Sequence, residues 1–328
     1  MKVFVTGGTG FIGSHLVDTL LQDSQIDEVR CLIRSKEKWL RNKPMVPYHG
    51  NLQSLSILKS AMEGVDIVYH LAAVTHASNR KHFEIHNVDA TENVVRTALK
   101  KGVRNIVVLS SLAAAGPSFA KPLEETAPLM PISSYGKSKK RMEEVLHQIA
   151  QNNPELSVKI LRPPAVYGPR DEDIYAFFKL ASKGVCPVAT NDENSEAEIS
   201  LMYVKDVVQA LQKSASMDKA GAHTYFIAGP EHYTWKEIAA ATGHVLNRKV
   251  VTLPISPKWL KRLGAVVERA GAMFGTYPAF NSEKANEMVM QWTCSIKKAN
   301  EELGYTPQYS LHRGLSATIQ WYKKHHWL

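Results

Sequence analysis

A tyrosine and a lysine that could take part in proton transfer stand four residues apart, at Tyr135 and Lys139. The segment around them has the apolar periodicity of a helix, and residues four apart lie on one helix face. An ammonium group on that face stabilises a phenolate, which lowers the pKa of the tyrosine from about 10 toward neutral pH. The spacing therefore predicts a general acid and base for proton transfer.

A second pair with the same spacing occurs at Tyr175 and Lys179, inside an apolar helical run. No strand ending in serine precedes this pair at a matching distance. The first pair differs, because an apolar strand-like run ends at Ser111, upstream of Tyr135 and Lys139. We therefore assign the first pair and Ser111 to the candidate catalytic site, and the second pair to core and surface.

A glycine-rich turn lies between a Val-rich segment at the start of the chain and a helical segment. In such a turn one glycine permits a tight bend, another lets the backbone approach a pyrophosphate, and a third lets the helix pack on the strand. The helix N-terminus then presents unpaired N–H groups to the anion. The order predicts a dinucleotide site made by Gly7, Gly10, Phe11, Ile12 and Gly13.

The second predicted strand, over residues 29–33, is followed by Arg34 rather than by an acid. An acid at this position hydrogen-bonds the ribose 2′-OH of NAD, whereas an arginine pairs with the 2′-phosphate of NADP. Lys38 or Arg41 would support Arg34 in that role. The sequence therefore favours NADP over NAD, and a solvated basic loop is the alternative interpretation.

Apolar runs alternate with helical patterns in the first half of the chain, which is typical of a parallel sheet covered on both faces. The sequence predicts an α/β fold, a doubly wound parallel sheet of the Rossmann type with a smaller, mostly helical C-terminal substrate lobe. The predicted dinucleotide-binding domain covers residues 1–165 and is rejoined by about 204–228. The lobe covers 166–203 and 229–328.

The chain has 328 residues, of which 44% are hydrophobic and 22% are charged, as in ordinary globular proteins. Its formal net charge of +9 is spread along the chain, so it indicates anionic small ligands or an acidic surface before nucleic acid. Three widely spaced cysteines favour a reducing, cytoplasmic location. His82 and His86 have a spacing suited to a metal, but no third ligand follows, so we expect no metal site.

Residues 257–274 have the pattern of a basic amphipathic helix. Its apolar stripe is Leu260, Leu263, Val267, Ala270 and Phe274. Such a helix packs on the core of its own lobe, and peripheral contact with a membrane surface is the alternative. No run approaches the roughly 18 apolar residues of a membrane span, so we expect none.

Five segments occur in a fixed order along the chain: Gly7–Gly13, His70–Ala73, Ser110–Ser111, Tyr135–Lys139 and Leu161–Arg170. Together they resemble the extended short-chain dehydrogenase/reductase superfamily, which includes the NAD-dependent epimerase/dehydratase group. The likeness covers most of the chain. It is closest in character to dihydroflavonol-reductase-like and 3β-hydroxysteroid-dehydrogenase-like members.

The resemblance implies that Tyr135 exchanges a proton with the reacting oxygen, and that Ser111 hydrogen-bonds the same oxygen. It implies that Lys139 binds the nicotinamide ribose and lowers the pKa of the tyrosine. Further cofactor contacts implied by the resemblance are Leu71, Ala72, Ala73, Pro163, Val166, Asn51 and Leu52. Asn51 stands where the family usually has an acid beside the adenine, and its amide carbonyl keeps an acceptor there.

Two departures from the family pattern bear on the substrate. Apolar residues 112–115 follow Ser111, so no acid is available there to protonate a leaving hydroxyl in dehydration. The Asn and Arg that grip the diphosphate of a sugar nucleotide are replaced by Pro163-Pro164 and by residues 198–201. The sequence therefore predicts reversible hydride transfer between NADP(H) and a carbonyl or alcohol on a small molecule.

Aromatic and apolar residues of the lobe favour an apolar or aromatic substrate, although they also suit an ordinary core: Phe177, Phe178, Trp259, Met273, Phe274, Tyr277 and Phe280. The alternatives are a nucleotide-sugar epimerase and a non-catalytic NADP-binding sensor or scaffold. The resemblance also implies a homodimer, formed through the helix that carries the tyrosine and the helix before the fifth strand.

Overall fold

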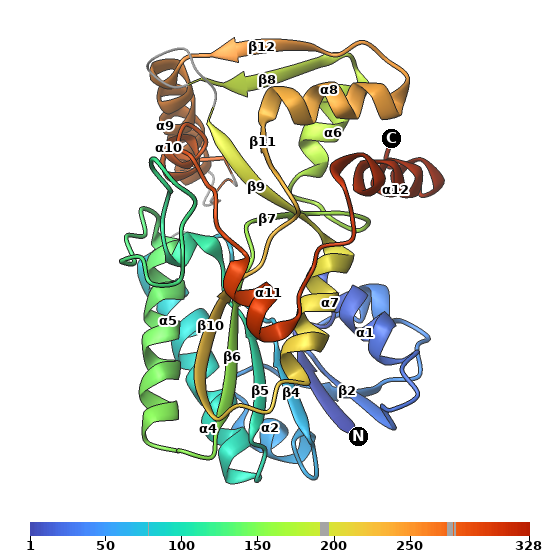
Figure 1. The fold of residues 1–328 in the computed structure, drawn as a ribbon, viewed down its shortest axis with the longest axis vertical. Helices are drawn as coiled ribbons and strands as arrows, with labels where there is room; N and C mark the ends of the chain where they lie inside the picture. The colour runs from blue at the N-terminus through green and yellow to red at the C-terminus, as the bar shows by residue number, and fades with distance from the viewer. Residues whose placement is uncertain (78, 191–196, 274–277, 279) are drawn as a thin grey trace.

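The computed structural model describes residues 1–77, 79–190, 197–273, 278 and 280–328. A seven-stranded parallel sheet forms one part of the molecule, in the order β10-β6-β5-β4-β1-β2-β3. The C-terminal lobe lies beyond the carboxyl ends of these strands (Figure 1). The strands are β1 (Lys2–Thr6), β2 (Glu28–Ile33), β3 (Val46–His49), β4 (Ile67–His70), β5 (Asn105–Leu109), β6 (Ser157–Arg162) and β10 (Gly221–Phe226).

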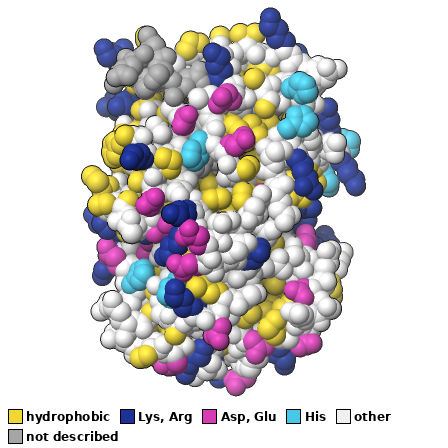
Figure 2. All heavy atoms as spheres, in the orientation of Figure 1, with side chains coloured by type: hydrophobic (Ala, Val, Ile, Leu, Met, Phe, Trp, Pro, Cys, Tyr) yellow, Lys and Arg dark blue, Asp and Glu magenta, His cyan; other side chains and the backbone are white. Residues whose placement is uncertain are grey.

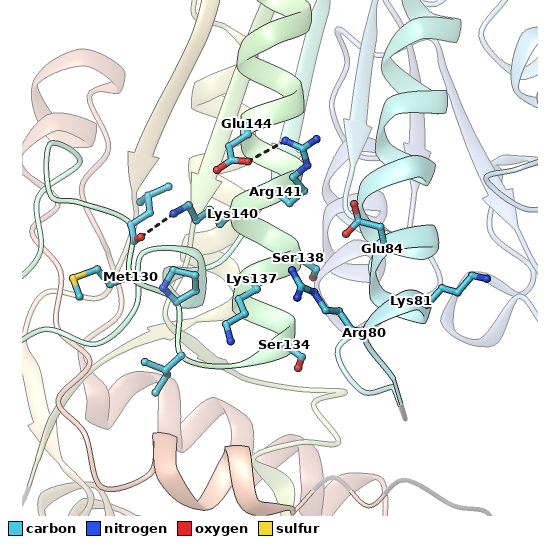
Figure 3. A pocket seen from close by; sticks show the side chains of 13 residues that line it. Arg80, Lys81, Glu84, Met130, Ser134, Lys137, Ser138, Lys140, Arg141 and Glu144 are labelled. Atoms are coloured by element: carbon cyan, nitrogen blue, oxygen red, sulfur yellow. Dashed lines mark hydrogen bonds and ion pairs between the residues drawn. The ribbon is translucent and has the colours of Figure 1, made fainter.

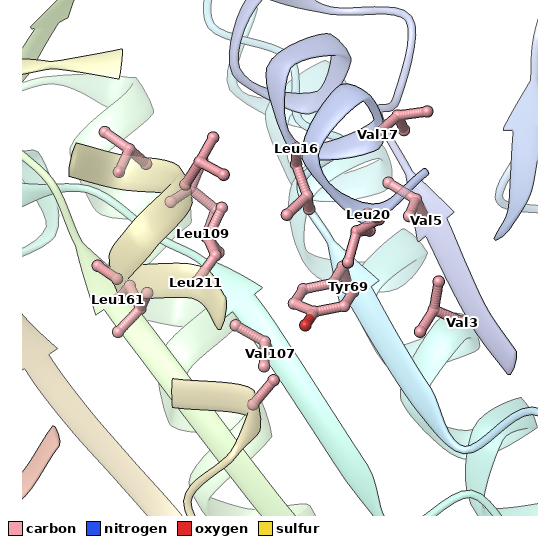
Figure 4. Packing of buried hydrophobic residues seen from close by; sticks show 14 of the residues in the cluster. Val3, Val5, Leu16, Val17, Leu20, Tyr69, Val107, Leu109, Leu161 and Leu211 are labelled. Carbon is pink, nitrogen blue, oxygen red and sulfur yellow. The ribbon is translucent and has the colours of Figure 1, made fainter. Parts of the chain in front are cut away.

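Two layers of helices cover this sheet. Helices α1 (Phe11–Leu20) and α7 (Val204–Ala215) pack on one face, and α2 (Leu55–Ala61), α4 (Ala90–Lys100) and α5 (Ser134–Gln151) pack on the other. The alternation of side chains along a strand sends β1 residues to both cores. Val3 and Val5 join the α1 cluster shown in Figure 4, and Phe4 joins the opposite one. The predicted doubly wound α/β fold is confirmed.

The helix before β5 is not uniform. A short helix α3 (Arg80–Phe83) passes into a π-helical segment η2 (Glu84–Asp89), and this continues into α4. A π-helical turn inserts extra backbone into a helix and is frequent at functional sites. Here it turns the Asn87 side chain into the interior, where it is fully buried.

The C-terminal region is helical, as predicted, and also holds two small sheets. Strands β7 (Ala165–Tyr167), β9 (Glu198–Tyr203) and β11 (His232–Thr234) form one, and β8 (Val185–Ala189) pairs in parallel with β12 (Val251–Ile255). Strands this short carry too few alternating residues for a clear sequence signal. The helices are α6 (Tyr175–Ser182), α8 (Trp235–Leu246), α9 (Pro257–Met273), α10 (Ser282–Glu287), α11 (Lys297–Leu303) and α12 (Leu311–Lys324).

The interpretation of the second tyrosine–lysine pair is confirmed. Tyr175 packs edge-on against Tyr322 and Trp327, and its hydroxyl donates a hydrogen bond to the Trp327 carbonyl. Lys179 is exposed, with its ammonium 5.7 Å from the centroid of the Tyr175 ring. This pair belongs to the core and surface of the lobe.

The predicted stripe of α9 is wrong in part. Leu260 is buried, but Leu263 and Ala270 are exposed, and Phe274 lies outside the described residues. The helix packs through Leu260 and Gly264, because α10 lies against that side. Among the described residues, no helix is long and apolar enough to cross a membrane.

Candidate functional site

The candidate acid and base stands in the first turn of α5. Ser133 caps this helix, since its hydroxyl accepts a hydrogen bond from the Gly136 N–H at 3.3 Å. Tyr135 and Lys139 follow on one face, and the lysine ammonium lies 5.9 Å from the centroid of the tyrosine ring. The structure therefore brings together the two side chains that the sequence spacing paired.

The acidity of the phenol differs from the prediction. Burial raises the pKa of Tyr135 to about 12, a hydrogen bond with Ser111 lowers it, and the charges of Glu287 and Asp173 raise it further. The expected lowering by Lys139 is absent from these causes. The lysine ammonium donates to the Leu109 carbonyl at 2.9 Å and to the Met142 sulfur at 3.9 Å, and among the hydrogen bonds of the described residues it makes none to the phenol.

Lys139 is held inside the protein, with 2% of its surface exposed. Burial disfavours the ammonium and lowers the pKa of Lys139 to about 8, and the negative charge of Glu143 opposes this change. Glu143 stands four residues further along α5, so Tyr135, Lys139 and Glu143 share one helix face. The carboxylate therefore limits the fall of the lysine pKa, so that the ammonium remains charged at neutral pH.

Glu143 itself is fixed by a buried ion pair. The Nε of Arg162, at the end of β6, donates to both Glu143 carboxylate oxygens at 3.0 and 3.1 Å, and its Nη2 donates at 2.5 Å. The Ser110 hydroxyl donates to the same carboxylate. Sequence reasoning missed this pair, because the two residues become neighbours only when α5 packs against β6.

Ser111 lies where β5 ends. Its hydroxyl caps the short helix η3 (Leu112–Ala114) by accepting a hydrogen bond from the Ala113 N–H at 3.1 Å. The Leu112 N–H donates to the Pro163 carbonyl at 2.8 Å, which ties this turn to the end of β6. Ser111 and Pro163 therefore lie at adjacent strand ends, as a shared cleft requires.

The glycine turn has the geometry of a dinucleotide cradle. Gly7 has φ +75°, and the Gly10 N–H donates to the Gly7 carbonyl at 3.0 Å before α1 begins at Phe11. A Cβ on Gly13 would lie 2.1 Å from the Gly7 carbonyl oxygen, so only glycine permits this approach. Phe11 and Ile12 are partly exposed at the helix start. These residues fit a bound pyrophosphate.

A buried hydrogen-bond chain holds the strand ends beside this turn. Thr6 Oγ1 lies 2.7 Å from His70 Nδ1, and His70 Nε2 lies 2.8 Å from Thr91 Oγ1. The Thr91 hydroxyl donates to the Asn87 carbonyl at 2.7 Å, so it accepts from His70 Nε2–H. The chain positions the adjoining segment Leu71–Ala73, of which Leu71 and Ala72 are partly exposed and Ala73 is exposed.

Asn87 is a site residue whose contacts the sequence did not reveal. Its amide oxygen accepts from the Val74 N–H at 2.8 Å, and its amide nitrogen donates to the Val74 carbonyl and the Ser138 hydroxyl, both at 3.0 Å. Ser138 lies between Tyr135 and Lys139 on α5. Asn87 therefore links the loop after β4 to the catalytic helix.

The predicted adenosine contacts lie at the ends of β2 and β3. Arg34 is exposed directly after β2, and its charge lowers the pKa of His86. The Asn51 side-chain oxygen accepts from the Gln53 N–H at 2.9 Å and from the Ser54 hydroxyl at 3.1 Å. The local turn therefore uses the carbonyl that was expected to contact adenine. Leu52 is partly buried, and Val166 is partly exposed within β7.

The aromatic residues of the lobe that favoured an apolar substrate are core or surface residues wherever the structure describes them. Phe178 is buried against Tyr322, Phe177 packs on Trp235, and Phe280 packs near Leu260. Trp259 is exposed, Phe274 and Tyr277 lie outside the described residues, and nothing is described of the Met273 side chain. The described members are core or surface residues and give no apolar substrate wall.

A separate cavity of about 950 Å³ lies beside the outer side of α5 (Figure 3). Tyr135, Lys139 and Ser111 do not line it. Two of its polar side chains are already engaged, because Arg141 pairs with Glu144 at 3.2 Å and Lys140 donates to the Leu129 carbonyl at 3.1 Å. The charged side chains around it are Arg80, Lys81, Glu84, Lys137, Lys140, Arg141 and Glu144.

Several known proteins are similar to this chain over nearly its whole length, in sequence or in fold. A ceramide reductase of Caulobacter vibrioides is 27% identical, covering 99% of this chain and 96% of that protein. An N-acetyl-alpha-D-glucosaminyl-diphospho-ditrans,octacis-undecaprenol 4-epimerase of Escherichia coli O157:H7 is 26% identical, covering 98% and 95%. The structure of MoeE5 in complex with UDP-glucose and NAD matches with a TM-score of 0.80 and 25% identity, covering 99% and 100%.

The model of the NAD dependent epimerase/dehydratase family matches residues 3–228, which include the glycine turn, Ser111, Tyr135 and Lys139. The matched region also spans the seven strands of the main sheet. The expected superfamily is confirmed. The chain therefore belongs to the NAD dependent epimerase/dehydratase family.

Proposed function

We propose that the protein is an NADP(H)-dependent oxidoreductase that interconverts a carbonyl and an alcohol on an apolar substrate. The observation that carries the proposal is the Tyr135 phenol, which is hydrogen-bonded to Ser111 and lies next to the buried Lys139. A bound nicotinamide nucleotide supplies or accepts the hydride. The side chains of the protein then have to transfer a proton to or from the reacting oxygen.

Tyr135 is the proton donor for carbonyl reduction. With a pKa of about 12 the phenol is protonated at neutral pH, and it can give its proton to an oxygen that gains negative charge. The Ser111 hydroxyl donates a hydrogen bond to the same oxygen. The ammonium of Lys139, whose charge Glu143 supports, holds the nicotinamide ribose beside the phenol. In alcohol oxidation the same groups act in reverse.

The charges near the phenol support an uncharged reacting group. Glu287 and Asp173 lie close enough to raise the pKa of Tyr135, so this part of the site is negative. A substrate with two phosphate charges nearby would be repelled. The apolar substrate class is further supported by the 27% identical ceramide reductase, since ceramide is a lipid.

Nucleotide-sugar epimerisation is the second candidate, because MoeE5 was solved with UDP-glucose. The Escherichia coli relative is also a 4-epimerase, although its named substrate carries undecaprenol in place of a nucleotide. An epimerase oxidises and reduces one substrate within a cycle, so the cofactor shows no net change. A reductase consumes NADPH in proportion to product. Following nicotinamide absorbance with a panel of lipid-like ketones and with UDP-sugars separates the two.

Tyr135→Phe tests the proposed role directly. We expect turnover to fall by about a thousandfold or more, because phenylalanine keeps the ring and removes the proton. The dissociation constant of NADPH, measured by fluorescence titration, should change little. Tyr175→Phe is the matched control, since it alters the other Tyr-x-x-x-Lys pair and should leave turnover unchanged. Equal activity of the two variants would refute the assignment.

We also propose a homodimer formed through α4 and α5. The exposed sides of these helices carry Arg96, Lys137 and Arg141. The family resemblance supports this surface. Sedimentation velocity of the purified chain, together with a Lys137→Glu/Arg141→Glu variant, tests it.

A further inference from the structure

Helix α9 exposes an apolar stripe on the side away from its own core. The stripe is formed by Trp259, Leu263, Val266 and Ala270, whose spacings of four, three and four residues place them on one helix face. Trp259 is 65% exposed, Leu263 51% and Val266 61%. The opposite side of α9 packs on the lobe through Leu260 and Gly264, so these exposed side chains take no part in that packing. Exposed large apolar groups at helical spacing mark a contact surface.

A second apolar surface lies at the same end of the molecule. Strands β8 and β12 pair in parallel with Val185 opposite Val251 and Pro187 opposite Leu253, so these four side chains share one face. All four are exposed, and Val251 and Leu253 are each 50% exposed. The other face of the pair packs inward through Cys186 and Val188. We call this face and the α9 stripe the apical surface.

Basic side chains flank the stripe. Lys258, Lys261, Arg262 and Arg269 are exposed on α9, and none of them makes an ion pair within the part of the chain that the structure describes. The Arg262 guanidinium lies 5.3 Å from the Trp259 ring centroid, beside the stripe. Figure 2 shows hydrophobic and basic side chains together at this end of the molecule. The combination suits an anionic phospholipid surface.

The apical surface lies close to the candidate catalytic residue. A Cβ on Gly264 of α9 would lie 2.8 Å from the Asn281 carbonyl and 3.0 Å from the Ala285 Cβ, so α9 packs tightly on α10. On α10, the Glu283 carboxylate accepts hydrogen bonds from the Ser134 N–H and hydroxyl, the latter at 2.7 Å. Ser134 precedes Tyr135. One short helix, α10, therefore connects the covered side of α9 to the start of the helix that carries Tyr135.

We propose that the apical surface docks the protein on a membrane containing anionic phospholipids. Trp259, Leu263 and Val266 enter the boundary between headgroups and acyl chains, and the α9 cations contact lipid phosphates. A second copy of the chain is disfavoured as occupant, because pairing two apical surfaces brings the four exposed cations of one α9 toward those of the other. Docking depends on this surface and not on catalysis, so it can be tested apart from the proposed function.

The test is co-sedimentation of the full-length chain with vesicles of equal parts phosphatidylcholine and phosphatidylglycerol. We expect the chain to bind these vesicles, and we expect added salt to weaken the binding. Binding to vesicles of phosphatidylcholine alone should be weaker by roughly tenfold or more. Trp259→Gln/Leu263→Gln/Val266→Gln should weaken binding by about tenfold or more, because the apolar stripe is lost. Lys258→Gln/Lys261→Gln/Arg269→Gln should abolish the preference for anionic vesicles.

Matched controls separate docking from other effects. Leu55→Gln/Lys59→Gln removes one exposed apolar and one basic side chain from α2, away from the apical surface, and should leave binding unchanged. Tyr135→Phe should sediment like the wild type even if the activity proves different. Failure of the wild-type chain to sediment would overturn the proposal. So would a stripe variant that binds vesicles normally, or one whose only defect is the loss of a dimer in sedimentation velocity.

Discussion

The proposed preference for NADP rests on one side chain, that of Arg34. It is exposed immediately after β2, where a guanidinium can pair with a 2′-phosphate. We expect Arg34→Ala to raise the KM for NADPH by roughly ten- to a hundredfold, because a charge-assisted hydrogen bond contributes about 1.5–3 kcal/mol. The KM for NADH should change little.

Steady-state kinetics with both cofactors measures this difference. Lys36→Ala is the control, since Lys36 is an exposed cation of the same loop. Equal losses with the two cofactors would show that Arg34 does not contact the 2′-phosphate.

Glu143 is a positioning residue that supports the charge of Lys139. The pKa of Lys139 is lowered to about 8 by burial, so activity that needs the ammonium should decline as pH rises through about 8. Glu143→Gln removes the charge that raises this pKa. The alkaline limb of the kcat profile should therefore move to lower pH, with little change in the substrate KM.

The same substitution leaves Arg162 buried without its partner, which costs about 3–5 kcal/mol of stability. Thermal unfolding of the variant shows at which temperatures it remains folded, and the pH profile of kcat is measured there. Ser110→Ala is the matched variant, because it removes a hydrogen bond to Glu143 and keeps the carboxylate. An unmoved alkaline limb in folded Glu143→Gln would exclude this positioning role.

The turn from β1 to α1 is the element that makes the cofactor cleft. The Cβ of Gly13→Ala would meet only backbone atoms, the nearest being the Gly7 carbonyl oxygen at 2.1 Å, so no side chain can move aside. We expect a loss of about 1–3 kcal/mol in the free energy of unfolding, together with weaker cofactor binding.

Gly8→Ala is the comparison within the same turn. Its Cβ would have its closest contacts at 3.4 Å, an ordinary packing distance, to side chains of Cys31, Leu40 and Val17. Urea unfolding should show a much smaller loss for Gly8→Ala than for Gly13→Ala. Similar losses would mean that the close approach of α1 to the turn is not the controlling feature.

Stability of the whole molecule should depend on acid through buried neutral histidines. Burial lowers the pKa of His70 to about 3 and that of His15 to about 4. The unfolded chain takes up a proton on each below about pH 6.5, whereas the folded chain stays neutral to lower pH, so acid favours unfolding. At pH 5 His70 alone should cost about 2 kcal/mol relative to neutral pH.

Urea unfolding between pH 7 and pH 5 checks this dependence. His70→Asn keeps one donor and one acceptor without a group that titrates, so its stability should fall less steeply with acid. Its stability at pH 7 should be lower, because the hydrogen bonds to Thr6 and Thr91 are no longer optimal. A wild-type slope retained in the variant would point to other titrating groups.

Features that depend on local geometry could be predicted from the order of the residues alone. The glycine turn, the helical spacing of Tyr135 and Lys139 and the alternation of apolar runs with helices each follow from residues close in the chain. They were enough to predict the α/β fold and the family. The inert nature of the Tyr175 pair also followed from its local context.

Contacts between residues far apart in the chain depend on how the helices and strands pack, so they could not be predicted from local sequence. The Glu143–Arg162 pair, the Asn87 bridge to Ser138 and the acids near Tyr135 all join separate elements. For the same reason the acidity of the phenol was predicted in the wrong direction: its pKa depends on burial and on where the Lys139 ammonium bonds. The outward stripe of α9 was equally hidden, because periodicity shows that a helix has faces but packing selects the one that is covered.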